Sequence, residues 1–154
     1  DEDSKISSIP NAMILFNPPC VLAAVPERKD YLSAQAMAGM AARMGVAPEQ
    51  LSPWHNVSKG QPPTLVLHGE VDPTVPFWTS KVFVEKMKKA GNHAELAAYP
   101  GEKHGFFNYG RGGNKMFIAT MRRTDEFLAS LGWLKGTPSI EKFAKAKRAE
   151  KKLD

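Results

Sequence analysis

The sequence predicts an α/β protein, a three-layer sandwich in which helices cover both faces of a mainly parallel sheet. Three short runs rich in apolar residues, 12–16, 64–68 and 94–99, have the length of strands. The first two lack polar alternation, which is typical of strands that are covered on both faces. Segments with helical spacing separate and follow these runs, and such alternation of strand and helix favours a parallel sheet.

The first predicted strand ends at Asn17, which two prolines follow. Residues 20–60 connect it to the second strand, and within them we expect a helix over 31–43 and a helical turn over 48–51. Pro48 suits the first position of that turn. Because the connection is longer than a crossover helix requires, we interpret it as a lid-like segment that covers a site or carries specificity.

Two further helices are predicted after the second strand. Segment 77–90 has apolar residues at helical spacing, lysines on its other side and Gly91 as a stop. After the third strand, Asn114 is expected to cap a helix that Gly132 closes. We predict that the apolar face of this last helix consists of Phe117, Thr120, Met121, Thr124, Leu128 and Leu131.

The composition, 42% hydrophobic and 24% charged over 154 residues, is that of about one soluble globular domain. We expect this domain to span 1–134, and a basic tail over 135–154 to be helical or disordered. The tail carries much of the formal net charge of +5, so we expect no nucleic-acid or membrane partner. No apolar run approaches the roughly 18 residues that a membrane span needs.

Cysteine and histidine usage argues against a metal site. The single cysteine, Cys20, excludes an intramolecular disulfide and a cysteine-based zinc cage. The four histidines are scattered and lack the i, i+4 spacing of a helical metal site. We therefore expect neither a metal nor a cofactor.

The stretch PTLVLHGEVDPTVPF, 63–77, carries the first candidate functional residue. Asp72 follows the second predicted strand, at the carboxyl edge where open α/β sheets build their sites. Asp72 and Pro73 are also common turn chemistry, so this stretch alone leaves a turn and a site equally open. His68, at the end of the strand, is expected to brace the loop through hydrogen bonds rather than to act as a catalyst.

A second candidate, His104, lies in the loop GEKHGFFN that follows the third strand. Neighbouring parallel strands end at the same edge of a sheet, about 4.8 Å apart. If the two strands are neighbours, the carboxylate of Asp72 and the imidazole of His104 come within hydrogen-bond reach. Such a pair is the orienting half of a triad of nucleophile, base and acid.

These stretches resemble the C-terminal half of an α/β-hydrolase, specifically the esterase branch similar to bacterial acetyl esterases and feruloyl-esterase-like proteins. The matching segments are SPWHNVSKGQPPTLVLHGEVDPTVPF and YPGEKHGFFN, and the likeness covers 11–134. The resemblance implies that Asp72, rather than Glu70 in the same loop, is the triad acid and that His104 is the general base. It implies a serine carboxylesterase for small acyl or carbohydrate-linked esters.

The nucleophile of this fold sits in a Gly-x-Ser-x-Gly elbow, and none of the nine serines here is so flanked. We therefore expect the chain to be a C-terminal fragment that lacks the nucleophile and the oxyanion loop and is inactive alone. Cys20 follows a strand end but lacks the glycine-flanked turn, so we do not expect it to replace the serine. Two alternatives remain, a peptidase of the prolyl-oligopeptidase type and a non-catalytic α/β module for binding or structure.

Four aromatic side chains lie near the expected site edge and are candidates for lining a substrate pocket. Large aromatic residues line most small-molecule pockets, but they also anchor loops to the body of a protein, so both roles stay open. These residues are Trp54, Trp78, Phe106 and Phe107.

The expected partners are a small-molecule ester and a second protein chain. We predict that the strand at 12–16 forms an open edge of the sheet. Exposed strand edges pair readily with other chains, so we expect this edge to be covered by a second copy or by rearranged local segments.

Overall fold

A computed structural model describes residues 7–140, 142–144 and 146 of the chain. Its sheet has three strands, β1 (Met13–Phe16), β2 (Thr64–Gly69) and β3 (Ala94–Tyr99), in the order β1-β2-β3. Both pairings are parallel. The predicted α/β class with a parallel sheet is confirmed, and β2 and β3 are neighbours as the site argument requires.

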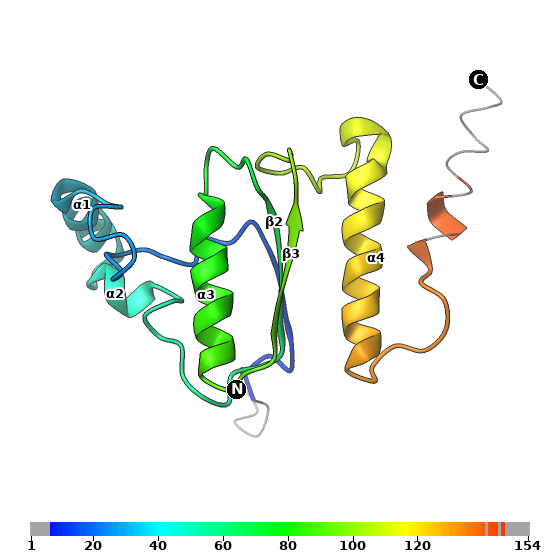
Figure 1. Cartoon of the computed structure of the whole chain (residues 1–154), viewed down its shortest axis with the longest axis horizontal. Helices are drawn as coiled ribbons and strands as arrows, with labels where there is room; N and C mark the ends of the chain where they lie inside the picture. The colour runs from blue at the N-terminus through cyan, green and yellow to red at the C-terminus, as the bar shows by residue number, and fades with distance from the viewer. Residues whose placement is uncertain (1–6, 141, 145, 147–154) are drawn as a thin grey trace, which may run out of the picture.

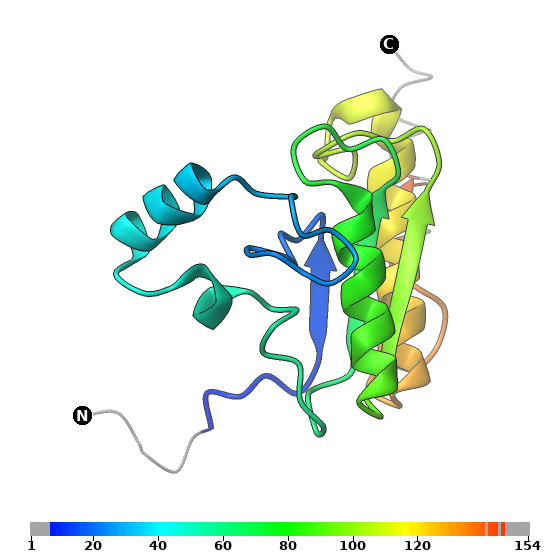
Figure 2. The same cartoon turned by 60° about the vertical axis from the view of Figure 1, so that its left-hand side comes forward.

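Helices cover both faces of this sheet. Helix α3 (Phe77–Lys89) packs on one face and α4 (Lys115–Ser130) on the other, which makes three layers (Figure 1). The long connection after β1 carries α1 (Ala34–Met44) and the short α2 (Pro48–Leu51). Figure 1 shows these two helices on the far side of α3 from the sheet, and Figure 2 shows that they stand away from the rest of the fold.

The core consists of two apolar clusters, one on each face of β2. Every residue of β2 is buried, and its side chains alternate between the two clusters, which explains the unbroken apolar run in the sequence. On the α3 side, the buried cluster contains Cys20, Val66, Phe83, Val84, Met87 and Ala94. On the α4 side, it contains Leu65, Leu67 and Phe127.

Helix α1 begins three residues later than the sequence predicts. Ser33 is its N-cap, and the Ser33 hydroxyl accepts a hydrogen bond from the backbone N–H of Ala36 at 3.1 Å. A side-chain acceptor at this position satisfies one of the free N–H groups of the first turn. Tyr31, which we expected inside the helix, instead packs edge-on against the ring of Trp78.

The start of α4 is where the sequence places it, but the predicted cap is wrong. Asn114 precedes the helix with a left-handed φ of 65°, and its side chain makes no capping hydrogen bond to the helix. The side-chain oxygen of Asn114 accepts instead from the backbone N–H of Gly110, at the other end of the turn. The 3-10 segment η1 (Arg111–Asn114) occupies that turn.

The predicted apolar face of α4 omits its most important residue. The buried residues of this helix are Thr120 and Phe127, and the side chain of Phe127 is fully enclosed. They are seven residues apart and therefore share one face of a helix. Leu128, which we predicted for this face, is only partly buried beside the cluster.

Part of the basic tail packs against the body of the protein. Ile140 and Ala144 are buried, and the ring of Phe143 lies 6.1 Å from the rings of both Tyr109 and Phe117. The tail residues 141, 145 and 147–154 lie outside the described residues. Within the described part of the chain, no helix combines the length and apolar character needed to cross a membrane.

Candidate active site

The loops that follow β2 and β3 are tied together at the carboxyl edge of the sheet. The backbone N–H of Glu70 donates to the carbonyl of Tyr99 at 3.0 Å, and that of Val71 donates to the carbonyl of Glu102 at 3.2 Å. Gly69, the last residue of β2, allows this close approach, because a Cβ atom there would collide with the Glu102 carbonyl. The glycine thus lets the histidine loop lie directly over the aspartate loop.

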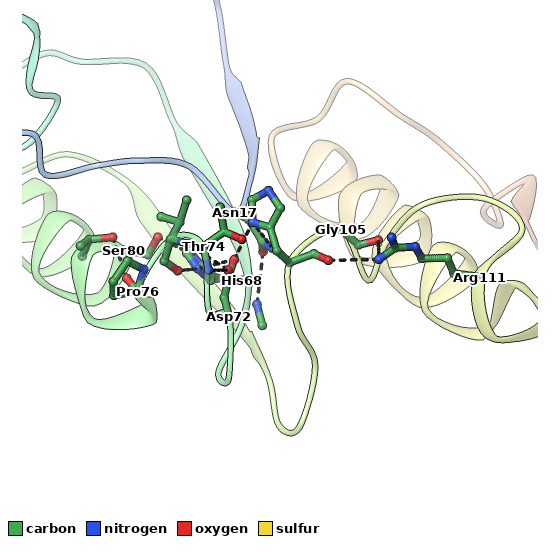
Figure 3. Close-up of polar contacts among 12 residues, drawn as sticks. Asn17, His68, Asp72, Thr74, Pro76, Ser80, Gly105 and Arg111 are labelled. Carbon is green, nitrogen blue, oxygen red and sulfur yellow. Dashed lines mark hydrogen bonds and ion pairs between the residues drawn. The ribbon is translucent and has the colours of Figure 1, made fainter. Parts of the chain in front are cut away.

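Asp72 forms both the turn and the polar pair that the sequence left open. Its Oδ1 accepts hydrogen bonds from the backbone N–H groups of Thr74 and Val75 at 2.8 and 2.9 Å (Figure 3). Its Oδ2 lies 2.8 Å from Nδ1 of His104. The side chain of Asp72 is fully buried, whereas Glu70 in the same loop is exposed.

The environment of Asp72 keeps its carboxylate ionised. Burial by itself raises the pKa of this carboxyl, but the N–H groups of Val75 and Thr74 and the His104 ring outweigh it. The net effect lowers the pKa of Asp72 below its usual value of 3.8. Because a carboxylate is only an acceptor, Nδ1 of His104 carries the proton between them. The other ring nitrogen, Nε2, then has a free lone pair and can act as a base.

A second buried histidine supports the aspartate loop. The ring of His68 is fully enclosed, with Nδ1 at 2.7 Å from the Ser80 hydroxyl and Nε2 at 2.9 Å from the Val75 carbonyl. Its Nε2 also lies 3.4 Å from Oδ2 of Asp72. Val75 is therefore held through its N–H by Asp72 and through its carbonyl by His68. His68 braces the loop, as the sequence predicts.

We expect the protein to lose stability as the pH is lowered below about 6.5, because His68 then becomes protonated in the unfolded chain. Burial is the largest effect on His68 and lowers its pKa, and a charge on His104 acts in the same direction. The Val75 carbonyl and the Asp72 carboxylate raise the pKa but do not outweigh burial. A group whose pKa is lowered on folding stabilises the protein fully above its unfolded pKa, about 6.5, and loses this contribution as the pH falls through the folded pKa. Each unit of lowering contributes about 1.4 kcal/mol.

Urea unfolding at pH 7, 6 and 5 measures this dependence, with His68→Gln as the variant that lacks the titrating ring. The free energy of unfolding is expected to drop more steeply for the wild type than for His68→Gln over this range. Asp72, whose pKa is also lowered, adds a second loss only below about pH 4. Parallel slopes for the two proteins between pH 7 and 5 would contradict the prediction.

The backbone after His104 has its own support. Gly105 adopts a left-handed φ of 69°, a conformation that other residues rarely adopt. The guanidinium of Arg111 donates from Nη1 to the carbonyl oxygens of His104 and Gly105, at 3.1 and 3.3 Å (Figure 3). Sequence reasoning did not identify Arg111, because the pattern GRGGN indicated only a turn.

Asn17 is a second residue that sequence reasoning did not assign to the site. It directly follows β1, and its side chain reaches both Gly69 at the end of β2 and the ring of His104 (Figure 3). The sequence marked this residue only as the end of a strand before two prolines. The available signal was its position, because β1, β2 and β3 all end at the same edge of the sheet.

Cys20 is unsuited to nucleophilic attack. Burial raises the pKa of its thiol to about 12, although the Ser80 hydroxyl, 4.0 Å from the sulfur, acts in the opposite direction. The thiol therefore stays protonated at neutral pH, and the thiolate is the reactive form of cysteine. Cys20 instead fills space in the apolar cluster on the α3 side of the sheet.

Two of the four candidate pocket aromatics belong to the long connection and its contacts with α3. Trp54 packs against the core cluster, and the ammonium of Lys86 lies 3.7 Å from the centre of its ring. Trp78, in the first turn of α3, packs against Tyr31, and the guanidinium of Arg28 lies 5.2 Å from its ring centre. Both tryptophans hold the connection against α3, and a role for them in a pocket stays a prediction.

The other two candidates follow His104 directly. Phe107 packs on Phe16 with 4.7 Å between ring centres, and Phe106 packs on Tyr99 at 4.9 Å. These contacts anchor the histidine loop to the ends of β1 and β3. Phe106 also lines a hollow of about 340 Å³ beside His104, so it combines an anchoring contact with a position next to the pair.

Within the residues that the structure describes, no cluster of three or more His, Cys, Asp or Glu side chains could hold a metal ion. The ionisable groups that contact one another at the sheet edge are the buried carboxylate of Asp72 and the rings of His68 and His104. This arrangement can orient an imidazole and move a proton. It requires a nucleophile for covalent chemistry.

Comparison with known proteins places the chain in a family. Residues 28–132, more than half of the chain, match the prolyl oligopeptidase family. No curated protein matches the sequence.

Solved structures of a thermophilic esterase from the Planctomycetes species Thermogutta terrifontis share the fold. The native form is 43% identical over 87% of this chain and 47% of its own, with a TM-score of 0.76. The propionate-bound form is 43% identical over 89% of this chain and 48% of its own, with a TM-score of 0.78. The form phosphonylated by sarin is 43% identical over 89% of this chain and 50% of its own, also with a TM-score of 0.78. The chain thus spans about half the length of these esterases. It belongs to the prolyl oligopeptidase family and has the fold of part of an esterase-like α/β-hydrolase.

Proposed function

We propose that the described residues supply the acid and the base of a serine carboxylesterase, with Asp72 as the acid and His104 as the general base. The single observation that carries this proposal is the 2.8 Å contact between Oδ2 of a buried, ionised Asp72 and Nδ1 of His104. The two residues lie in loops after neighbouring parallel strands of an esterase-like fold. The nucleophilic serine and the oxyanion donors come from protein outside these 154 residues.

The chemistry follows from the protonation state of the pair. Nε2 of His104 takes the proton from the serine hydroxyl as the oxygen attacks the ester carbonyl, and then returns it to the leaving alkoxide. An acyl-enzyme remains, and a water molecule activated by the same Nε2 releases the acid. Asp72 holds the ring through Nδ1 and stabilises its charged form during both proton transfers.

The comparisons favour a small ester as the substrate. The similar thermophilic esterase has been solved with propionate bound and with butyrate bound, which are short-chain carboxylic acids. A substrate of this size needs only a small site beside the histidine. We therefore propose short acyl esters, including acylated carbohydrates, as the substrate class, with no cofactor, no metal, and neither nucleic acid nor membrane as partner.

A half-swap chimera tests the proposal. Residues 11–134 of this chain replace the matching segment of the Thermogutta terrifontis esterase, which supplies the missing half of the fold. We expect this chimera to hydrolyse p-nitrophenyl butyrate, because the grafted acid and histidine complete the site. The 154-residue chain alone is expected to show no turnover above its own His104→Ala variant, since it contains no flanked nucleophile.

Two outcomes would argue against the proposal. Hydrolysis by the 154-residue chain alone that depends on His104 would show that these residues contain an unrecognised nucleophile. A chimera that folds cooperatively and still lacks turnover on any short acyl ester would favour the non-catalytic α/β module. In that case the Asp72–His104 pair would serve the structure of the loop alone.

The family match supports a second candidate, a serine peptidase. Residues 28–132 belong to the prolyl oligopeptidase family, and a peptidase would use the same acid and histidine. The two candidates differ in the leaving group, which is an alcohol in an ester and an amine in a peptide. Assaying the chimera on a proline-containing peptide anilide beside the aryl ester distinguishes them, and we expect the ester to be the faster substrate.

We further propose that the free edge of β1 pairs with a second copy of the chain. Among the described strands, β1 pairs with β2 alone. The N–H groups of Met13 and Asn17 donate to carbonyls on the β2 side, so by alternation those of Ile14 and Phe16 point outward. Light scattering is expected to show association of the wild-type chain, and Ile14→Pro, which removes one outward donor, is expected to shift it toward the monomer.

The matched control for this edge is Ile14→Ala, which shortens the same side chain but keeps the N–H group. We expect this variant to associate like the wild type. Equal masses for the wild type and Ile14→Pro, both those of a single folded chain, would contradict pairing through β1. Equal loss of association in both variants would assign the effect to the side chain rather than to the strand edge.

A further inference from the structure

Asn17 has a left-handed backbone conformation in which glycine would be the residue of lowest steric cost. Its φ is 43°, in the left-handed region, and only 3% of its surface is exposed. Asparagine tolerates this region better than most residues do, but glycine adopts it without steric cost. A buried asparagine at this point therefore directs attention to what its amide contacts.

The orientation of this amide is set by the backbone of β2. Oδ1 of Asn17 accepts a hydrogen bond from the backbone N–H of Gly69 at 3.2 Å. A backbone N–H can only donate, so the oxygen of the amide faces β2 and its NH₂ group faces away. That NH₂ nitrogen lies 3.5 Å from Nδ1 of His104. The end of β1 thus presents a fixed donor edge to the ring.

The fixed amide acts on the charge of the ring. Nδ1 of His104 already donates its proton to Asp72, so the NH₂ group places the positive end of a dipole beside another donor. A positive dipole end near a titrating ring disfavours its cationic form. The carboxylate of Asp72 acts in the opposite sense, because it favours the cation.

The other polar groups that face His104 are accounted for. Burial keeps the ring of His68, which shares Oδ2 of Asp72, in its neutral form. The guanidinium of Arg111 is bonded to the carbonyls of His104 and Gly105, on the backbone side of the residue. Glu102 and Lys103 precede it in the loop and carry opposite charges. Asn17 is the group that meets the ring from β1.

We infer that Asn17 is a positioning residue for His104. Its amide, held by Gly69, presents a donor and no acceptor to Nδ1, so the carboxylate of Asp72 is the acceptor that Nδ1–H can reach. This inference rests on the proposed role of His104, but it concerns the ring itself and is measurable without turnover.

An NMR titration of the 154-residue chain tests the inference. With ¹⁵N-labelled histidine, long-range proton–nitrogen spectra report the pKa and tautomer of each of the four rings, and His104→Ala identifies the signals of His104. Asn17→Gly keeps the left-handed backbone and removes the amide, so we expect the titration of His104 to move toward the cationic form. Asn17→Asp places a carboxylate at the same point, and we expect a rise of about 1 to 3 pKa units.

The matched control is Asn92→Gly. Asn92 is also buried, and its Oδ1 accepts from the N–H groups of Gly60 and Gln61, but it lies before β3, at the opposite edge of the sheet. We expect this variant to lose stability and to leave the titration of His104 unchanged. A shift of His104 in Asn92→Gly as large as that in Asn17→Gly would overturn the inference, because it would reflect general loosening.

The deciding result is the titration of His104 in folded variants of Asn17. If the pKa and tautomer in Asn17→Gly match those of the wild type, Asn17 serves only the turn and the inference is overturned. Should Asn17→Gly fail to fold, an unchanged titration of His104 in the isosteric Asn17→Asp overturns the inference, because it would show that the side chain at this position does not reach the ring. An inactive chimera together with shifted titrations would reject the proposed function and leave the contact between Asn17 and His104 established.

Discussion

Replacing His104 by alanine in the chimera is expected to lower kcat for p-nitrophenyl butyrate by about 10⁴-fold or more. Without the imidazole, no group takes the proton from the nucleophile or returns it to the leaving alkoxide. The residual rate would come from binding and oxyanion stabilisation alone. KM is expected to change little, because in the proposed mechanism the ring acts in the transition state rather than in binding the substrate.

Asp72→Asn in the same chimera is expected to cost about 10⁴-fold in kcat. An amide in place of the carboxylate removes the negative charge that stabilises the imidazolium. If the amide turns its NH₂ group toward the ring, it also selects the wrong tautomer. The double variant His104→Ala/Asp72→Asn is expected to lose no more than His104→Ala, since the two residues act as a unit in the proposed mechanism.

The matched control is Glu70→Gln, which removes the exposed carboxylate of the same loop. We expect its kcat to stay within about twofold of the parent chimera, because surface charges away from a site have small effects. A larger loss in Glu70→Gln than in Asp72→Asn would transfer the role of acid to Glu70. Circular dichroism and cooperative melting of each variant separate loss of chemistry from loss of fold.

Phe127→Ala is expected to lower the free energy of unfolding by about 3–5 kcal/mol, the usual range for emptying a fully buried aromatic site. The ring of Phe127 is enclosed between Leu65 and Leu67 of β2 and the ring of His93, 5.5 Å away. Of the two buried residues of α4, Thr120 and Phe127, it is the apolar one. Its removal leaves a cavity between α4 and the sheet.

Leu128→Ala is the control for Phe127→Ala, since Leu128 is the neighbouring residue that the sequence pattern places on the apolar face. Its side chain is partly exposed in the structure, so we expect a smaller loss of about 1–2 kcal/mol. Urea unfolding of both variants at constant pH measures the difference. An equal or larger loss in Leu128→Ala would support the sequence-based face and contradict the structure at this helix.

The class of each element could be predicted because it depends on neighbours in the sequence. The run at 64–68 is apolar without alternation, and the structure shows β2 buried on both faces. Segment 77–90 alternates lysines with apolar residues at helical spacing and forms α3. The approach of Asp72 and His104 also followed, because two parallel neighbouring strands must end at the same edge.

Element boundaries and caps were predicted less well. Ser33 and Asn114 are both good capping residues by type, yet Ser33 caps α1 and Asn114 does not cap α4. The difference lies in the chain before each helix. The turn of η1 holds Asn114 in a left-handed conformation and directs its side chain to Gly110, which no local pattern at Asn114 predicts.

The sequence by itself determined the α/β class, the parallel strands and the two polar residues at their carboxyl ends. The reason is that the spacing of apolar residues and the alternation of strands and helices depend on residues that are close in the sequence. Only the tertiary structure decided which side chains support those two residues. Asn17 and His104 are 87 positions apart and meet through the pairing of three strands, and Phe127 enters the core because its face of α4 packs against β2. Contacts of this kind depend on how whole elements pack, and packing leaves no periodic trace in a single sequence.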